Sequence, residues 1–188
     1  MATFDVLVNG YVRERKGVEH VAGTVSLVRT GDLVIVTDPG IMPSQSTLLD
    51  PLTAHGLTVD DVTHVFVSHH HIDHTRNIGM FPTATVVDSG SFYDGDIWGE
   101  HPGDGYRLGA DVEVLTTPGH SFECASLAVR TADLGTVVLT HAWWFSDMTP
   151  VEDPLGVDQE QLAASRRRIL SIADWVVPGH GEPFTLQR

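Results

Sequence analysis

Histidine is concentrated in one short stretch of the chain, "HHHIDH" at residues 69–74. The apolar run at 65–67 precedes it and indicates a buried strand that ends at the histidines. In an extended segment, residues i and i+2 point to the same side, so His69 and His71 can hold one metal ion while His70 faces away. Imidazole is a common ligand of zinc and of other transition metals. The spacing therefore predicts a metal site.

Three further histidines stand where apolar segments end, at His120, His141 and His180. Strands that end at one rim of a sheet bring their last residues to a single cleft, held by the core behind them. Asp73 and His74, after the chain turns, can face a second metal. A surface or core role would explain one isolated histidine. It does not explain the 69–74 stretch together with three further histidines at strand ends. The sequence has no His-Glu-x-x-His motif, which excludes the helical zinc-protease site.

The elements that must position these residues follow from hydrophobic periodicity. Apolar runs rich in Val, Leu and Ile predict strands, and two segments with a 3.6-residue period predict helices. The strands are expected at 4–12, 23–40 with a turn at 31–32, 63–69, 84–90, 112–120, 126–132, 136–144 and 175–184, and the helices at 44–56 and 158–173. Expected strands lie in both halves of the chain, and each half also contains one expected helix. This order predicts an α+β fold, an αββα sandwich with two mixed or antiparallel sheets and helices outside.

The helix at 158–173 has the clearest signals. Asp158 can cap its first turn, and Leu162, Ile169 and Leu170 are expected on one buried face. A length of 188 residues makes a single domain over 1–188 the default expectation.

Composition limits the classes of partner. The net charge is −14 with neutral histidines and Lys16 is the only lysine, so a long nucleic acid is disfavoured as a substrate. A small-molecule or anionic substrate is expected instead. The first residues lack a signal-peptide pattern, and no apolar segment is long enough to span a bilayer. Cys124 is the only cysteine, which favours a cytoplasmic location. The oligomeric state stays open.

The "HHHIDH" stretch is a His-x-His-x-Asp-His motif, and with it the chain resembles the metallo-β-lactamase-fold hydrolases. "VTDPG" at 36–40, "TTPGHS" at 116–121 and "VVPGHGEPF" at 176–184 resemble the other site motifs of that family. They occur in the family's order, and the resemblance covers nearly the whole chain. It implies the same αββα sandwich.

The resemblance also implies a role for each matching residue. Asp38 would fix a ligand imidazole by a hydrogen bond. Zinc, as one or two ions, is the expected cofactor, with iron or manganese as alternatives. A water or hydroxide held between two metals would have its pKa lowered toward about 7, and Asp73 would orient it or take its proton. The implied metal ligands are His69, His71 and His120 for the first ion, and Asp73, His74 and His180 for the second.

The chain departs from the family at one position. Where the family usually has a Gly-Asp whose carboxylate bridges both metals, this chain has Thr140-His141. An imidazole gives one lone pair to one metal and brings no negative charge. Three hypotheses follow: the second metal binds more weakly, the two metals lie further apart, and the more positive site prefers an anionic substrate group.

Aromatic residues near the predicted rim are candidates for the substrate pocket. Either Trp143 or Trp144 should reach the cleft, with the other in the core. The segment 89–109, expected as a loop, could bring Trp98 over the same rim.

The function expected from these observations is a metal-dependent hydrolase that acts on an ester, thioester, lactone, amide or phosphodiester. Two other classes remain. A mononuclear iron dioxygenase of a thiol-derived substrate would use two histidines and one carboxylate, and His141 stands where that carboxylate is expected. A non-catalytic metal-binding protein would have less need of Asp73.

Overall fold

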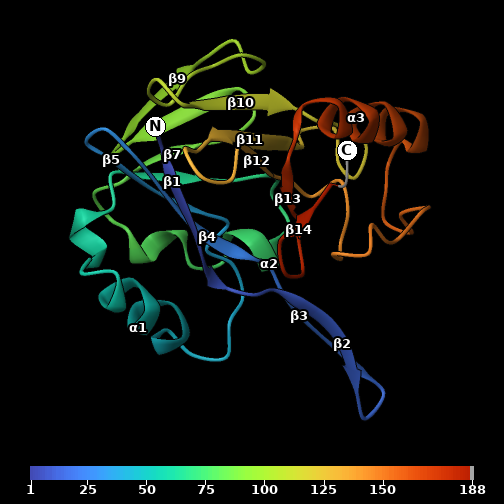
Figure 1. Cartoon of the computed structure of the whole chain (residues 1–188). Coiled ribbons are helices and arrows are strands. Elements are labelled where there is room, and N and C mark those ends of the chain that lie inside the picture. Colours follow the sequence, from blue (N-terminus) through green and yellow to red (C-terminus); the bar gives the residue numbers. More distant parts are fainter. Residues whose placement is uncertain (187–188) are drawn as a thin grey trace.

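The computed structural model describes residues 1–186 and has two β-sheets packed face to face, with helices on the outer faces (Figure 1). The α1 helix covers one sheet and the α3 helix covers the other. The expected αββα arrangement is therefore confirmed. Within residues 1–186, no helix combines the length and the apolar character that crossing a bilayer requires.

The first sheet has seven strands, of which the central three are parallel. The α1 helix (Ser46–Ala54) and a short 3₁₀ helix at Val59–Asp61 form the crossover from β5 to β6. The α2 helix (Ile72–Thr75) and a second 3₁₀ helix at Ile78–Met80 connect β6 to β7. In spatial order the strands are β1 (Thr3–Val8), β4 (Val25–Thr30), β5 (Leu33–Thr37), β6 (His64–Phe66), β7 (Thr85–Val87), β8 (Ser91–Asp94) and β9 (Ile97–Glu100).

The second sheet has five strands, and the α3 helix (Gln159–Ile172) is the crossover between its one parallel pair, β12 and β13. The strands are β10 (Val112–Thr116), β11 (Ala125–Arg130), β12 (Thr136–Leu139), β13 (Trp175–Val177) and β14 (Phe184–Thr185). Because β10 and β12 both run antiparallel to β11, the strands β10, β12 and β13 all point in one direction.

Alternation along the strands builds two hydrophobic layers on each sheet. In β5, Ile35 faces the space between the sheets, and Val36 packs with Leu48 and Leu52 of α1 on the outer face. Both faces of these strands are buried, which is why their sequences are continuously apolar rather than alternating. This sandwich holds the ends of its strands rigidly in place.

The α3 helix begins where Asp158 accepts a hydrogen bond from the backbone N–H of Gln161 at 2.9 Å, as expected of a cap. Leu162 and Ile169 are fully buried, but Leu170 is 39% exposed. Seven residues bring a helix back to nearly the same face, whereas an eighth rotates the side chain by about 100°. The prediction that Leu170 shares the buried face was therefore wrong.

Two hairpins were missed. The segment 4–12 is not one strand, because β2 (Tyr11–Arg15) pairs with β3 (Val18–Ala22) in a separate two-stranded sheet that projects from the body (Figure 1). Its turn has positive φ at Lys16 and Gly17, 54° and 74°, as a two-residue hairpin turn requires. The expected loop at 89–109 contains β8 and β9. Both hairpins are short and largely exposed, and polar residues interrupt their apolar ones, so they lack the continuous apolar run that predicts a buried strand.

Candidate metal centre

The candidate site lies where strands of both sheets end. His69 and His71 follow β6, and the two other members of that motif, Asp73 and His74, both belong to α2. His120, His141 and His180 follow β10, β12 and β13, whose parallel direction brings their C-terminal ends to one edge of the second sheet. The structure thus brings all seven predicted metal-site residues together, although they come from four separate segments.

Three imidazoles form the first group of potential ligands. Nδ1 of His71 lies 3.0 Å from Nε2 of His69 and 3.0 Å from Nε2 of His120. These three ring nitrogens face one another rather than the solvent or the core. Such convergence of lone pairs is what a tetrahedral zinc site with three histidine ligands needs.

A carboxylate and two imidazoles form the second group. Oδ2 of Asp73 lies 3.5 Å from Nε2 of His74 and 3.6 Å from Nε2 of His180. Nε2 of His74 is buried and forms no hydrogen bond with any residue that the structure describes. The two groups correspond to the two ligand sets that the sequence motifs imply, but the metal-binding roles themselves stay predictions.

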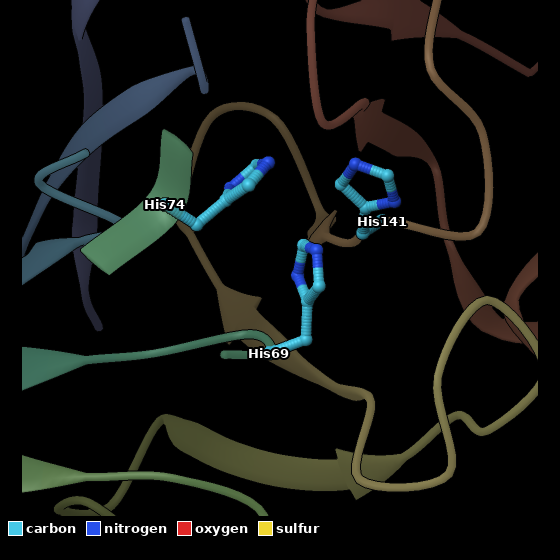
Figure 2. Close-up of side chains that lie close together, drawn as sticks. All are labelled: His69, His74 and His141. Atoms are coloured by element: carbon cyan, nitrogen blue, oxygen red, sulfur yellow. The ribbon is translucent and has the colours of Figure 1, made fainter. Parts of the chain in front are cut away.

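His141 contacts both groups, because its ring centre lies 4.1 Å from that of His120 and 5.0 Å from that of His180. Figure 2 shows the rings of His69, His74 and His141 turned toward a common centre from β6, α2 and the end of β12. Nε2 of His141 is 3.1 Å from Nε2 of His180, and its Nδ1 is buried with no hydrogen-bond partner among residues 1–186. The position that carries a bridging carboxylate elsewhere in the family thus holds an imidazole in contact with both groups.

Glycine is required next to this ring. A Cβ atom at Gly179 would lie 2.3 Å from Cδ2 and 2.8 Å from Nε2 of His141. Both distances are shorter than any normal contact, so a side chain there would have to displace the imidazole. The "PGH" sequence at 178–180 therefore makes room for His141 as well as presenting His180.

Asp38 orients two of the histidines, as the sequence predicts for one. Its Oδ2 is 3.0 Å from Nδ1 of His74 and also accepts a hydrogen bond from Oγ of Ser68, which lies 3.0 Å from Nδ1 of His69. A carboxylate can only accept, so Nδ1 of His74 carries the proton and Nε2 keeps its lone pair. Asp38 has φ of 46°, a left-handed conformation that is uncommon outside glycine and that accompanies this positioning.

Asp153 orients a third histidine, and sequence reasoning missed it. Its buried Oδ2 is 2.8 Å from Nδ1 of His120 and accepts a hydrogen bond from Nε1 of Trp144 at 3.0 Å. Nδ1 of His180 similarly donates to the carbonyl oxygen of Ala22 at 2.9 Å. Asp153 lies between β12 and α3 in a segment without hydrophobic periodicity. Its only signal in the sequence is that it is an acidic residue in an expected loop.

Electrostatics favour the neutral form of three buried imidazoles, those of His69, His141 and His180. Burial, reinforced by the neighbouring imidazoles, holds the pKa of His69 and of His141 well below the ordinary value. The same causes, burial first and then His74, lower the pKa of His180 to about 4. Neutral imidazoles at pH 7 keep the lone pairs that metal ligands need.

The donor set fits a divalent metal on direct structural grounds. Nε2 of His74 and Nδ1 of His141 are buried polar atoms without a hydrogen-bond partner in the part of the chain that the structure describes. A buried polar atom left unsatisfied carries a desolvation cost of about 1–3 kcal/mol. Four of the rings use Nδ1 to donate to a fixed acceptor and turn Nε2 inward. This is the arrangement in which hydrogen-bonded partners orient metal-binding histidines.

A cavity of about 340 Å³ opens over this cluster. Its floor includes Asp73 and His141, and Trp144 forms part of its wall. Trp143 is 3% exposed and packs in the core between the second sheet and α3, so of the two expected alternatives Trp144 is the residue at the cavity. The remaining lining residues are Val12, Glu19, Val21, His71, His120, Pro154, Leu155 and His180.

The prediction that the segment 89–109 brings Trp98 over the rim was wrong. Trp98 lies on β9, is 60% exposed and pairs with Tyr93 of β8 at the far edge of the first sheet. Neither residue lines the cavity over the cluster. The pairing of β8 with β7 carries this segment along the sheet rather than over the strand ends.

The fold and this cluster define the class of protein. The sequence profile of the metallo-beta-lactamase superfamily matches residues 18–123, and the chain belongs to this superfamily, many of whose members are hydrolases. The chain is 35% identical over 191 aligned residues to Metallo-beta-lactamase domain-containing protein 1 of Xenopus laevis, an alignment that covers 95% of the chain and 79% of the frog protein. The segments "RNIG" at 76–79 and "PGHGEPF" at 178–184 by themselves indicate a resemblance to Metallo-beta-lactamase domain-containing protein 1, and this relative confirms it.

Other similar proteins extend the comparison. The human Metallo-beta-lactamase domain-containing protein 1 is 38% identical over 162 residues, which cover 82% of the chain but only 60% of the human protein. An N-acyl homoserine lactonase of Bacillus thuringiensis is 26% identical over 148 residues, covering 70% of the chain and 59% of the lactonase. A crystal structure of an N-acyl homoserine lactone hydrolase superposes with a TM-score of 0.68 at 19% identity, covering 95% of this chain and 92% of that one. This structural likeness shows the shared fold.

Proposed function

We propose that this chain is a zinc-dependent hydrolase that cleaves an acyl bond, an ester, thioester or lactone, in a small molecule. The observation that carries the proposal is the convergence of six imidazoles and one carboxylate in one cluster, five members of which, His71, Asp73, His120, His141 and His180, line an open cavity. In this proposal the ligands are His69, His71 and His120 for one zinc ion, and Asp73, His74 and His180 for another, with His141 in contact with both sets.

Zinc held there would act as a Lewis acid that activates water as a nucleophile and polarises the oxygen of the scissile bond. The chain supplies the rest of the chemistry. Asp73 faces the cavity and offers a carboxylate oxygen that accepts the proton of the attacking water. Asp38 and Asp153 keep His74 and His120 in the tautomers that turn Nε2 inward.

Size and charge support a small acyl substrate. A cavity of about 340 Å³ is at the small end of ligand sites. The net charge of −14 opposes a nucleic-acid substrate. The lactonase relative of Bacillus thuringiensis hydrolyses a lactone according to its name, and the similar crystal structure holds the product N-hexanoyl-L-homoserine at its metal centre. An acyl bond next to an apolar chain is therefore the substrate chemistry that we favour.

The test is metal content followed by a substrate panel. Protein purified without added metal is expected to contain zinc by elemental analysis and to hydrolyse esters, thioesters or lactones. Chelation should abolish the activity and zinc should restore it. Asp73→Asn should lower kcat by at least about 100-fold, the range of general base catalysis. Asp147→Asn is the matched control, since Asp147 is exposed and its carboxylate bonds to Thr149 of its own loop.

Two outcomes would overturn this proposal. Iron in place of zinc, with oxygen uptake on a thiol-derived substrate, would establish a dioxygenase. Tight zinc binding without turnover of any acyl, amide or phosphodiester substrate would establish a non-catalytic metal-binding protein.

A further inference from the structure

The outer wall of the cavity is made by the β2–β3 hairpin, which the sequence pattern did not reveal. In its register Val12 lies opposite Val21, and Glu14 lies opposite Glu19. Side chains alternate between the two faces of a strand, so these four residues share one face. Val12, Glu19 and Val21 line the cavity, which identifies this face as the one turned toward the metal cluster.

The basic residues of the hairpin belong to the opposite face. Arg13 lies opposite His20 in the register, one position away from the cavity-facing residues on each strand. The guanidinium carbon of Arg13 lies 3.8 Å from the centre of the Tyr11 ring, a cation–π contact on that outer face. Within residues 1–186, no cation forms an ion pair with Glu19 or Glu14, so their charges are not neutralised locally.

Local stability does not account for this arrangement. Like charges directly opposite each other on an antiparallel pair destabilise it. Glu14 and Glu19 are such a pair, on a hairpin that makes few other contacts with the body of the protein. The two carboxylates therefore destabilise the hairpin. Their negative charge acts instead on a molecule that enters the cavity.

The rest of the wall is apolar. Val12, Val21, Trp144, Pro154 and Leu155 line the cavity, and the histidines that also line it belong to the metal cluster. Apart from Asp73 at the cluster itself, Glu19 is the only carboxylate among the lining residues. A substrate bound by its reactive group at the floor would therefore extend along an apolar wall and meet one negative charge at the hairpin.

We infer that Glu19 sets the substrate class of the proposed hydrolase. Acyl substrates whose distal end is neutral or cationic bind better than acyl substrates that end in a carboxylate or phosphate. This inference rests on the proposed function, and it reverses the preference that the positive charge of the metals alone would suggest. Glu19 is exposed, so the discrimination is expected to be about fivefold for one charge, as partly screened ion pairs give.

The experiment compares three matched substrates with zinc-loaded protein. They are the para-nitrophenyl esters of hexanoate, of its omega-trimethylammonium derivative and of adipate, which carry a neutral, a cationic and an anionic group at the distal end. The parent should show higher kcat/KM for the neutral and cationic esters than for the anionic one. Glu19→Gln should raise kcat/KM for the anionic ester about fivefold and leave the neutral ester unchanged, while Glu19→Lys should reverse the order of the two charged esters.

Two variants sharpen the comparison. Glu100→Gln removes the same charge from an exposed residue of β9 that does not line the cavity, and all three esters should keep their parental kcat/KM. Glu14→Gln removes the charge opposite Glu19 and should shift the ratios in the same direction by a smaller factor. Equal ratios of anionic to neutral kcat/KM in the parent and both Glu19 variants would overturn the inference and leave the hydrolase proposal intact.

A binding measurement separates the two proposals. Hexanoate, its trimethylammonium derivative and adipate can be titrated into the zinc-loaded protein by calorimetry, with no turnover required. If no ester is hydrolysed, the proposed function fails, yet a weaker affinity for adipate that Glu19→Gln removes would still support the role of Glu19. Equal affinities for all three acids in the parent would overturn that role.

Discussion

Asp153 accepts a hydrogen bond from Nδ1 of His120 at 2.8 Å while the same carboxylate oxygen accepts one from Nε1 of Trp144 at 3.0 Å. Its other oxygen accepts a hydrogen bond from the backbone N–H of Leu155 at 2.9 Å. One buried carboxylate thus connects a candidate metal ligand with two residues of the cavity wall. Burial alone would raise the pKa of Asp153, but the hydrogen bonds from these partners, His120 first, lower it on balance. The group therefore stays ionised at neutral pH.

Removal of this carboxylate is expected to weaken metal binding. Asp153→Asn should lower zinc affinity by about 10- to 100-fold, because the partner that orients His120 loses its charge. Competition with a chromogenic chelator measures the affinity, and Asp147→Asn on the exposed loop serves as the control. An unchanged zinc affinity with a folded protein would show that His120 needs no such partner.

Gly179→Ala is expected to disturb the centre through His141. The added Cβ would approach Cδ2 of that ring to 2.3 Å, so the imidazole must shift. Overpacking of this kind costs about 1–3 kcal/mol of unfolding free energy, and bound zinc per chain should fall as well. Gly181→Ala is a matched control, because its Cβ would meet its nearest atom, the backbone N of Ser146, at 3.4 Å. Equal stability and zinc content in both variants would contradict the close packing of Gly179 against the ring.

His141→Asp tests the consequence of an imidazole in contact with both groups. A carboxylate can share its oxygens between two cations and adds a negative charge, so the variant should bind its second zinc ion more tightly than the parent. At limiting zinc, the stoichiometry by elemental analysis should rise from about one toward about two ions per chain. Identical stoichiometry and affinity in the two proteins would remove the basis for weaker binding at the second position.

Cys124 provides a pH-dependent test that does not involve the metal. Burial, partly offset by hydrogen bonds with Ser121, raises the pKa of this thiol to about 11. Only the thiolate is a nucleophile, so the raised pKa predicts slow alkylation at pH 8 and a rate that increases until the pH approaches about 11. Iodoacetamide labelling of the native protein should be at least about tenfold slower than that of denatured protein at the same pH. Equal labelling rates for native and denatured protein would show that the thiol is accessible and that its pKa is not raised.

Much of the fold was predictable because its strands are buried on both faces. Val36 and Ile35 face opposite layers, and both layers are apolar, so the run around them indicates a strand without ambiguity. The turn at Gly31 and the capping of α3 by Asp158 follow from local chemistry. The hairpins β2–β3 and β8–β9 were not predictable in this way. Their strands are short and mostly exposed, and polar residues interrupt the apolar ones, so no continuous apolar run separates them from loops.

The sequence by itself determined which side chains gather at the candidate centre, because each of the histidines His69, His120, His141 and His180 follows an apolar strand closely. A strand that ends at a sheet edge leaves its next residues at that edge, whatever the neighbouring segments do. Only the tertiary structure decided which other residues surround these histidines. It selected Trp144 rather than Trp143 for the cavity, paired Asp153 with His120, and placed Glu19 among the residues that line the cavity. Those relationships depend on packing between segments far apart in the chain, which no local pattern of residues encodes.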